Sequence, residues 1–430
     1  MLGLGLVSLF VFLMVIGVPI AFVIAIIAFL GIAAAPYIPI VTVVMKMFNG
    51  LNSFVLLAVP LFILAANLMN SGKISKKLID FSIAIVGHIK GGLAHANVLV
   101  SMIFAGISGA SQADTAGIGK VLIPNMIDTG YDKETAVGVT AASSTIGVII
   151  PPSIPMIIYA GLTNTSVSSL FLAGIVPGVL SGFGMMAVIY GLSLKRGYPQ
   201  YERTNLKKLF DLTKEAFPAL MTPFIIIGGV ITGWYTATEA AAFASLYTFL
   251  IGMFYYKTIK IKDLPGILED TLTLSSLSLF ALATASALGE LMGYYQVSSV
   301  VQQFFTTHID SAWIFMTIII VFFLFIGTFM DAIPAMILFI PVILPVAINL
   351  GISPVLLGMV TIITLAIGLV TPPYGLCLLI AAKIGNMSIE RSFSAVLMFI
   401  AVVLFVLLFI AFLPDIAFFI PKMFDPTLLM

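Results

Sequence analysis

The stretch Ile146-Gly147-Val148-Ile149-Ile150-Pro151-Pro152 returns 221 positions later as Ile367-Gly368-Leu369-Val370-Thr371-Pro372-Pro373. The same offset pairs three further positions with their counterparts: Gly106 with Gly327, Pro124 with Pro345, and Gly130 with Gly351. Tandem prolines remove two backbone donors and disrupt the preceding helical turn. The sequence therefore predicts an internal duplication in which one helix of each copy is broken at the same place.

The composition places the chain in a lipid bilayer. Of its 430 residues, 61% are hydrophobic and 9% are charged, which is too apolar for a water-soluble fold. The net charge of +1, without a polybasic block, argues against a nucleic-acid partner. The single cysteine, Cys377, excludes an intrachain disulfide, and the three histidines have no spacing for metal ligation. We therefore expect no transition metal.

The positive charges predict how the chain is oriented. Seventeen of the nineteen lysines and arginines fall into five clusters. The positive-inside rule places these clusters in the cytoplasm and the lysine-free turns near Asn164, Tyr235 and Gln302 outside. Nine crossings satisfy this orientation: 4–33, 53–70, 133–160, 168–194, 217–235, 239–256, 268–292, 354–382 and 392–413.

Two further apolar stretches do not fit as crossings. The first, 94–127, has Lys90 before it and Lys133 after it, both on the cytoplasmic side. A continuous helix of that length would measure about 51 Å, against a hydrocarbon core of roughly 30 Å. The small and polar residues from 106 to 112 favour a turn in its middle, and the second stretch, 313–350, has its turn at 327–331. We therefore expect two re-entrant hairpins, one entering from each side.

The two copies cross the membrane in opposite directions, so the repeat is inverted. The expected fold is an all-α polytopic membrane protein with inverted-topology repeats, two re-entrant helical hairpins and two broken helices. Residues 1–93 are predicted to form scaffold helices and a connecting arm, and 94–195 the first transport repeat. Residues 196–312 are predicted to form further scaffold helices and a second arm, and 313–430 the second transport repeat.

The interruptions indicate where a cation binds. Non-helical backbone at membrane depth persists only where protein, water or a ligand satisfies its polar groups. The carbonyls freed before each proline pair, together with nearby hydroxyls, provide uncharged oxygens that suit Na⁺, with one site expected per repeat. The candidate sodium ligands lie at the hairpin tips and the breaks: Ser108, Gly109, Ser111, Ser143, Ser144, Thr145, Gly147, Gly327, Thr328, Asp331, Thr364, Gly368 and Thr371. No other cofactor is expected.

The half-helices that follow each break suit an anionic substrate. Their N-termini carry partial positive charge and free N–H groups, which favour a carboxylate. The candidate substrate contacts are Ser111, Gln112, Asp114, Pro152, Ser153, Pro373 and Tyr374. Asp331 has a second interpretation, because a carboxylate at that position also caps a helix beginning at Ala332.

With these features the chain resembles the large membrane subunit of tripartite ATP-independent periplasmic (TRAP) transporters. The resemblance is carried by GISGASQADT at 106–115, SSTIGVIIPPSIP at 143–155 and GTFMD at 327–331. It implies a member of the ion-transporter superfamily that takes up an organic acid across the bacterial inner membrane, driven by sodium through an elevator motion. The implied cargo is a sialic acid-like acidic sugar or a C4-dicarboxylate. The implied partners are a separate small four-helix membrane subunit and a periplasmic substrate-binding protein.

Other classes of protein remain as alternatives. A standalone sodium-coupled dicarboxylate symporter of related fold would share the hairpins and work without partners. A proton-conducting subunit would be expected to carry a chain of buried Lys, Glu and His residues across the midplane, which this sequence lacks. An enzyme is not expected, because the one candidate catalytic dyad, Asp114 and Asp331, falls at two separate tips.

Overall fold

The computed structural model describes residues 2–71, 74–309 and 311–424, so the outer ends of the predicted segments 1–93 and 313–430 lie outside the described residues. The described residues are mainly helical, with no strand among them. Six described helices are long and apolar enough to cross a membrane, or seven if the bent pair α3 and α4 is one span. The predicted all-α polytopic fold is confirmed.

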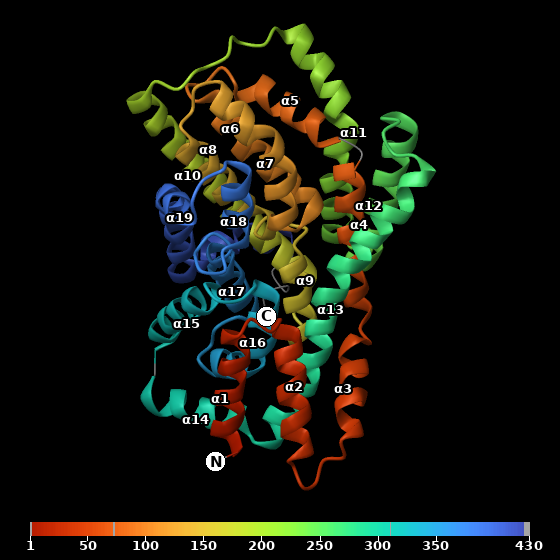
Figure 1. Cartoon of the computed structure of the whole chain (residues 1–430), viewed down its shortest axis with the longest axis vertical. Coiled ribbons are helices and arrows are strands. Elements are labelled where there is room, and N and C mark those ends of the chain that lie inside the picture. Colours follow the sequence, from red (N-terminus) through yellow and green to blue (C-terminus); the bar gives the residue numbers. More distant parts are fainter. Residues whose placement is uncertain (1, 72–73, 310, 425–430) are drawn as a thin grey trace.

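One set of helices forms a wall along one side of the molecule, which we call the scaffold (Figure 1). Its central member, α13, packs against α2, α3 and α4, while α12 packs between α4 and α11. The approach of α3 to α13 is close because Gly50 faces Ser286 and Lys46 pairs with Glu290 at 2.7 Å. The bounds are α3 Val41–Leu51, α4 Ala58–Ser71, α11 Leu206–Ile231, α12 Ala237–Leu250 and α13 Leu264–Tyr294.

The first apolar segment differs from the sequence prediction. Residues 4–33 form two helices, α1 Leu2–Val15 and α2 Ile20–Ala33, and the predicted single crossing is wrong. Gly17, at φ +84°, and Pro19 turn the chain between them. Figure 1 shows the two helices side by side, with the N-terminus and the turn into α3 at the same end of the molecule. Each helix is about 21 Å long, too short to cross alone.

Both predicted hairpins are present. In the first, α6 Gly92–Ser108 and α7 Ser111–Asp128 pack against each other and turn at Gly109, where φ is +61°. In the second, α15 Ala312–Gly327 turns into α16 Ala332–Asn349 through residues 328–331. A glycine at the first tip allows the left-handed conformation that this turn needs.

Both predicted broken helices are present as well. In the first copy, α8 Lys133–Ser144 and a short 3₁₀ turn, Thr145–Val148, precede the proline pair, and α9 Ile154–Thr163 follows it. In the second copy, α17 Pro354–Gly368 precedes the pair and α18 Leu376–Ile384 follows it. Both Pro-Pro peptide bonds are cis. Each broken helix leads, after a short connection, into a long helix. This helix is α10 Val167–Arg196 in the first copy and α19 Ile389–Phe412 in the second.

Two shorter helices connect the scaffold to the hairpins. One is α5 Ile74–Val86, which packs against both α6 and α11; the other is α14 Val297–His308, which packs against α16. In Figure 1 they lie across the two opposite ends of the molecule. The connection after α5 is also bound to the one after α10, because Tyr201 N–H donates to Gly87 O at 2.9 Å and Gly91 N–H to Pro199 O at 3.2 Å. The connection into the first repeat and the connection out of it are therefore held together.

A polar cluster around Asp132 fixes the start of α8. Asp132 caps this helix by accepting from Thr135 N–H at 2.8 Å, and it also accepts from Arg196 at 2.8 Å and from the Tyr198 hydroxyl. Burial raises the pKa of Asp132, but the hydrogen bonds from Tyr198, Arg196 and Thr135 outweigh it and lower the pKa to about 2. The cluster therefore joins the end of α10 to the beginning of α8.

Candidate functional site

A cavity of about 700 Å³ lies where the two hairpin tips and the two breaks meet the scaffold. The hairpin tips contribute residues 109–110, 112–113 and 329–334, and the breaks contribute residues 148, 154–155, 369, 374, 376 and 380. The opposite wall comes from the α1–α2 turn, α4 and α13. The inverted repeat thus brings segments more than 200 residues apart to one site.

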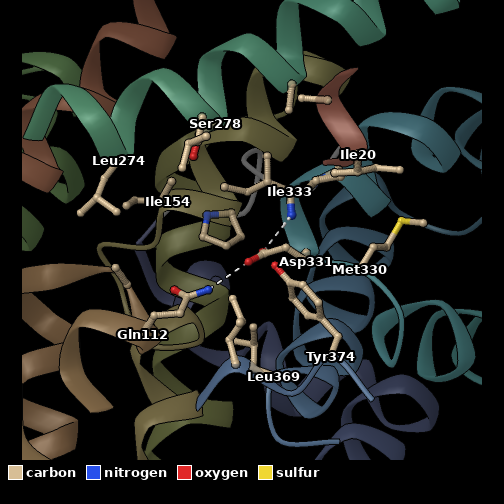
Figure 2. Close-up of a pocket in the computed structure, with 18 of the residues that line it drawn as sticks. Ile20, Gln112, Ile154, Leu274, Ser278, Met330, Asp331, Ile333, Leu369 and Tyr374 are labelled. Carbon is tan, nitrogen blue, oxygen red and sulfur yellow. Dashed lines mark hydrogen bonds between the residues drawn. The ribbon is translucent and has the colours of Figure 1, made fainter. Parts of the chain in front are cut away.

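A side-chain bridge joins the two tips inside this cavity. Gln112 Nε2 donates to Asp331 Oδ2 at 3.0 Å, and Ile333 N–H approaches Asp331 Oδ1 at 3.5 Å as the cap of α16 (Figure 2). Figure 2 also shows Tyr374 directed toward the same carboxylate. Asp331 therefore fits both interpretations of its sequence position, because it caps a helix and also lines the cavity.

The backbone of each hairpin tip contacts the backbone at the break of its own repeat. In the second copy, Tyr374 N–H donates to Thr328 O at 2.9 Å, and a Cβ added at Gly368 would lie 2.5 Å from Gly327 O. In the first copy, Ile154 N–H donates to Gly109 O at 3.4 Å. Glycine at these positions lets one backbone approach another closely.

A second polar site lies behind the first tip, outside the cavity lining. Asp114 is fully buried; its Oδ1 accepts from Ser108 at 2.5 Å, whereas Oδ2 has no hydrogen-bond partner among the described residues. The hydroxyl of Ser111 is also buried and finds no partner in the same part of the chain. Both face Gly147 in the break, since a Cβ there would lie 2.6 Å from Asp114 Oδ2 and 3.4 Å from Ser111 Oγ. Two unpaired oxygens thus converge on a space that glycine leaves open.

The remaining candidate hydroxyls mostly bond within their own helices. Ser144 and Thr145 donate to carbonyls three or four residues earlier, as do Thr328, Thr364 and Thr371 in the second copy. Ser143 instead joins a buried network between α6 and α8, formed with Asn97, Ser101 and Thr140. A donating hydroxyl keeps its lone pairs, so these positions can still offer oxygen to a cation.

The structure divides the predicted substrate contacts into two groups. Gln112 and Tyr374 line the cavity, whereas Ser111, Asp114, Pro152, Ser153 and Pro373 do not. Ser153 caps α9 by accepting from Met156 N–H at 3.4 Å, and it donates to Val148 O at 2.7 Å. The substrate role that the sequence suggests for Asp114 is at odds with its position, because it is buried beside Ser108 and Gly147.

The charge of the cavity is unusual for an anion site. Asp331 is its single charged lining residue among those described, and no lysine or arginine lines it. Four helix N-termini are directed to it, however: α7 through Gln112, α9 through Ile154, α16 through Ala332 and α18 through Leu376. Each such terminus carries about half a positive charge. Several of the N–H groups already have acceptors, since Ile154 N–H donates to Gly109 O, Met156 N–H to Ser153 Oγ and Cys377 N–H to Leu369 O, so α9 and α18 contribute mainly through their dipoles. The scaffold residues Asn67 and Ser278 also line the cavity, and sequence reasoning missed both.

The family model of the "Tripartite ATP-independent periplasmic transporter, DctM component" matches residues 6–416. The chain belongs to this family. Its TRAP relatives are transporter permeases of the inner membrane and are not enzymes, so this chain is a multi-pass inner-membrane transport protein. Large permeases of the family work in general with a small membrane subunit and a periplasmic binding protein.

Curated relatives resemble the chain over most of its length. It is 36% identical over 379 residues to the "Sialic acid TRAP transporter large permease protein SiaM" of Vibrio cholerae, covering 88% of this chain and 89% of that protein. It is 34% identical over 377 residues to the "C4-dicarboxylate TRAP transporter large permease protein DctM" of Pseudomonas aeruginosa, covering 88% of each. Both similarities extend over the hairpins and the breaks.

A solved structure shares the fold. The YdaH transporter of Alcanivorax borkumensis matches with a TM-score of 0.61 at 14% identity, covering 86% of this chain and 87% of that one. At this identity the similarity speaks for the fold alone. The TRAP permease therefore shares its architecture with this transporter.

Proposed function

We propose that this TRAP permease takes up an organic acid by sodium-driven transport, in which the hairpins and broken helices move together against the scaffold. The observation that supports the proposal best is the convergence of four helix N-termini on one cavity that contains no basic side chain. A carboxylate bound there is stabilised by backbone N–H groups and helix dipoles. Co-bound cations would supply the remaining positive charge.

The first sodium site is proposed behind the tip of α6 and α7. Ser108, Ser111 and Asp114 present oxygen atoms there, and two of these atoms have no partner within the part of the chain that the structure describes. Leaving a buried carboxylate oxygen unpaired is costly, so a ligand at this position has a strong driving force. Oxygen ligands of this kind suit a hard cation such as Na⁺. The second site is proposed around Asp331, close to Gly327 and Gly368.

The proposed substrate is a sialic acid-like acidic sugar, with a C4-dicarboxylate as the second candidate. Two relatives support this proposal. The one named for sialic acid is 36% identical to this chain, and the one named for C4-dicarboxylates is 34% identical. The neutral polar groups Gln112, Tyr374, Asn67 and Ser278 in the cavity suit a hydroxylated molecule. We also propose that a separate small subunit and a periplasmic binding protein complete the transporter.

The decisive experiment is uptake by proteoliposomes that contain this chain and its small subunit, with the cognate binding protein outside. We expect N-acetylneuraminate or a C4-dicarboxylate to accumulate under an inward sodium gradient. Replacing sodium by choline should abolish the accumulation. Robust uptake in choline buffer would contradict sodium coupling, and activity of this chain alone would favour a standalone symporter.

Asp331→Asn tests the second sodium site in the same assay. It keeps the size of the side chain and removes its charge. We expect a lower apparent affinity for sodium by about tenfold or more, equivalent to one charge-assisted interaction. Undiminished sodium-driven uptake would show that Asp331 only caps α16.

A further inference from the structure

The scaffold wall of the cavity contains a polar group that the hairpin tips do not provide. Asn67 lies on α4 within an otherwise apolar stretch, and it faces the same cavity as Gln112 and Asp331. Its amide Nδ2 donates to Thr271 Oγ1 on α13 at 3.0 Å. If Asn67 only joined α4 to α13, this one bond from Nδ2 would be sufficient. The amide oxygen, Oδ1, takes no part in it.

The hydrogen-bond network fixes the orientation of the Asn67 amide. Thr271 has one hydroxyl hydrogen, and it donates this hydrogen to Ile267 O at 2.7 Å. Thr271 Oγ1 can then only accept, so the NH₂ group of Asn67 must face it. The amide oxygen, Oδ1, is therefore directed away from Thr271, and among the described residues it accepts no hydrogen bond.

The scaffold wall carries a second polar group, on α13. Ser278 lines the cavity two turns after Thr271, and Figure 2 shows it opposite Asp331, on the scaffold side. The other α13 residues that line this wall, Leu274, Leu277 and Ala281, are apolar. An acceptor in an apolar wall favours a ligand that brings a donor to it, because an unpaired polar group in such surroundings is costly.

We propose that Asn67 Oδ1 is a specificity-determining contact that accepts a hydrogen bond from a hydroxyl group of the transported acid. This inference rests on the proposed function, since it requires the acid to occupy the cavity. The carboxylate is held by the helix N-termini of the hairpins and breaks, and the hydroxyl is recognised by the scaffold. Because Asn67 belongs to the scaffold, the contact exists only in the conformation that brings the tips opposite α4.

The test compares matched pairs of acids in Asn67→Ala and wild-type proteoliposomes. One pair is N-acetylneuraminate and its mono-deoxy analogues, and the other is malate and succinate. We expect Asn67→Ala to raise KM about tenfold for the acid with the recognised hydroxyl, equivalent to one hydrogen bond, and to leave KM for the analogue lacking it nearly unchanged. The binding protein is the same for both proteins, so its own preference cancels from the comparison.

Ser245→Ala is the matched control. Ser245 also makes a polar contact within the scaffold, donating to Leu61 O at 2.6 Å, but it lies outside the cavity lining. A purely structural Asn67 would behave like Ser245, lowering the amount of folded protein without changing the ratio of the two KM values. That outcome, with wild-type uptake intact, would overturn the inference alone. Absence of sodium-driven uptake of all four kinds of acid by the wild type would overturn the proposed function as well.

A cysteine at position 67 provides an independent measurement. The native Cys377 is buried, so a water-soluble thiol reagent should label Asn67→Cys and spare the wild type. Ser245→Cys should stay unlabelled, since Ser245 is buried. The transported acid, added with sodium, should slow labelling at position 67 by several-fold. An unreactive or unprotected cysteine there would contradict the placement of Asn67 in the occupied cavity.

Discussion

Asp114 and Asp331 follow the two hairpin tips, but the fold gives them different surroundings. Asp331 faces the cavity and bridges to Gln112, whereas Asp114 is buried behind the tip with Ser108. The repeat offset of 221 pairs Asp331 with Ala110 and Asp114 with Ala335, so the sequence shows the two acids at different positions of the repeat without showing their surroundings. Only the position of Gly147, which comes from a different helix, makes the site around Asp114 visible.

Asp114→Asn tests the proposed first sodium site. The substitution preserves the hydrogen bond with Ser108 but removes the negative charge that a cation needs. We expect the sodium concentration for half-maximal uptake to rise about tenfold or more, while KM for the acid at saturating sodium changes little. Asp211→Asn on the exposed part of α11 is the control and should leave both values unchanged. Equal sodium dependence of the two variants would exclude Asp114 as a ligand.

At the scale of elements, the sequence predicted the hairpins and the breaks because each leaves a mark on it. Lys90 and Lys133 fix both ends of the first hairpin on one side, and the proline pairs mark the breaks directly. The α1–α2 turn was missed because no charged residue marks it and the largely apolar stretch 4–33 resembles one tilted helix; its one mark is the pair Gly17 and Pro19. Likewise, Asn67 is a single polar residue in an apolar stretch. Its neighbours across the cavity come from other parts of the chain, so they become known only with the fold.

Gly368→Ala tests whether the second tip must rest on its break. A methyl group there would lie 2.5 Å from the backbone oxygen of Gly327, which cannot move aside as a flexible side chain would. We expect the tip to be displaced and uptake to fall at least about tenfold, with a destabilisation of about 1–3 kcal/mol from overpacking. Uptake and the thermal unfolding midpoint measure the two effects.

Gly191→Ala on α10 is the matched control for this substitution. It replaces a helical glycine that has no atoms within 4 Å of the added methyl, so alanine should be neutral or slightly stabilising. If Gly368→Ala transported as well as Gly191→Ala, the close contact between tip and break would have no functional importance.

At the scale of the whole molecule, the proposed transport requires the hairpins to move against the scaffold. One contact between these parts is narrow enough to be locked covalently. A Cβ at Gly117 on α7 would lie 3.7 Å from Cγ of Asn70 on α4, where a cysteine at position 70 would carry its sulfur. With an S–S bond of about 2.05 Å, the sulfur of one cysteine lies about 3 Å from Cβ of the other, so a bridge between cysteines at these positions requires α4 and α7 to approach by about 0.7 Å.

The double substitution Asn70→Cys and Gly117→Cys should therefore stop uptake after oxidation and recover it after reduction, because the bridge fixes one hairpin to the scaffold. The native Cys377 is buried and should not interfere. The single variants Asn70→Cys and Gly117→Cys are the controls: neither can form the bridge, so the same oxidation should leave their uptake intact. Mass spectrometry of the oxidised double variant establishes that the bridge forms. Full uptake with the α4–α7 bridge closed would show that the first hairpin does not move against α4, and the proposed motion would then be wrong.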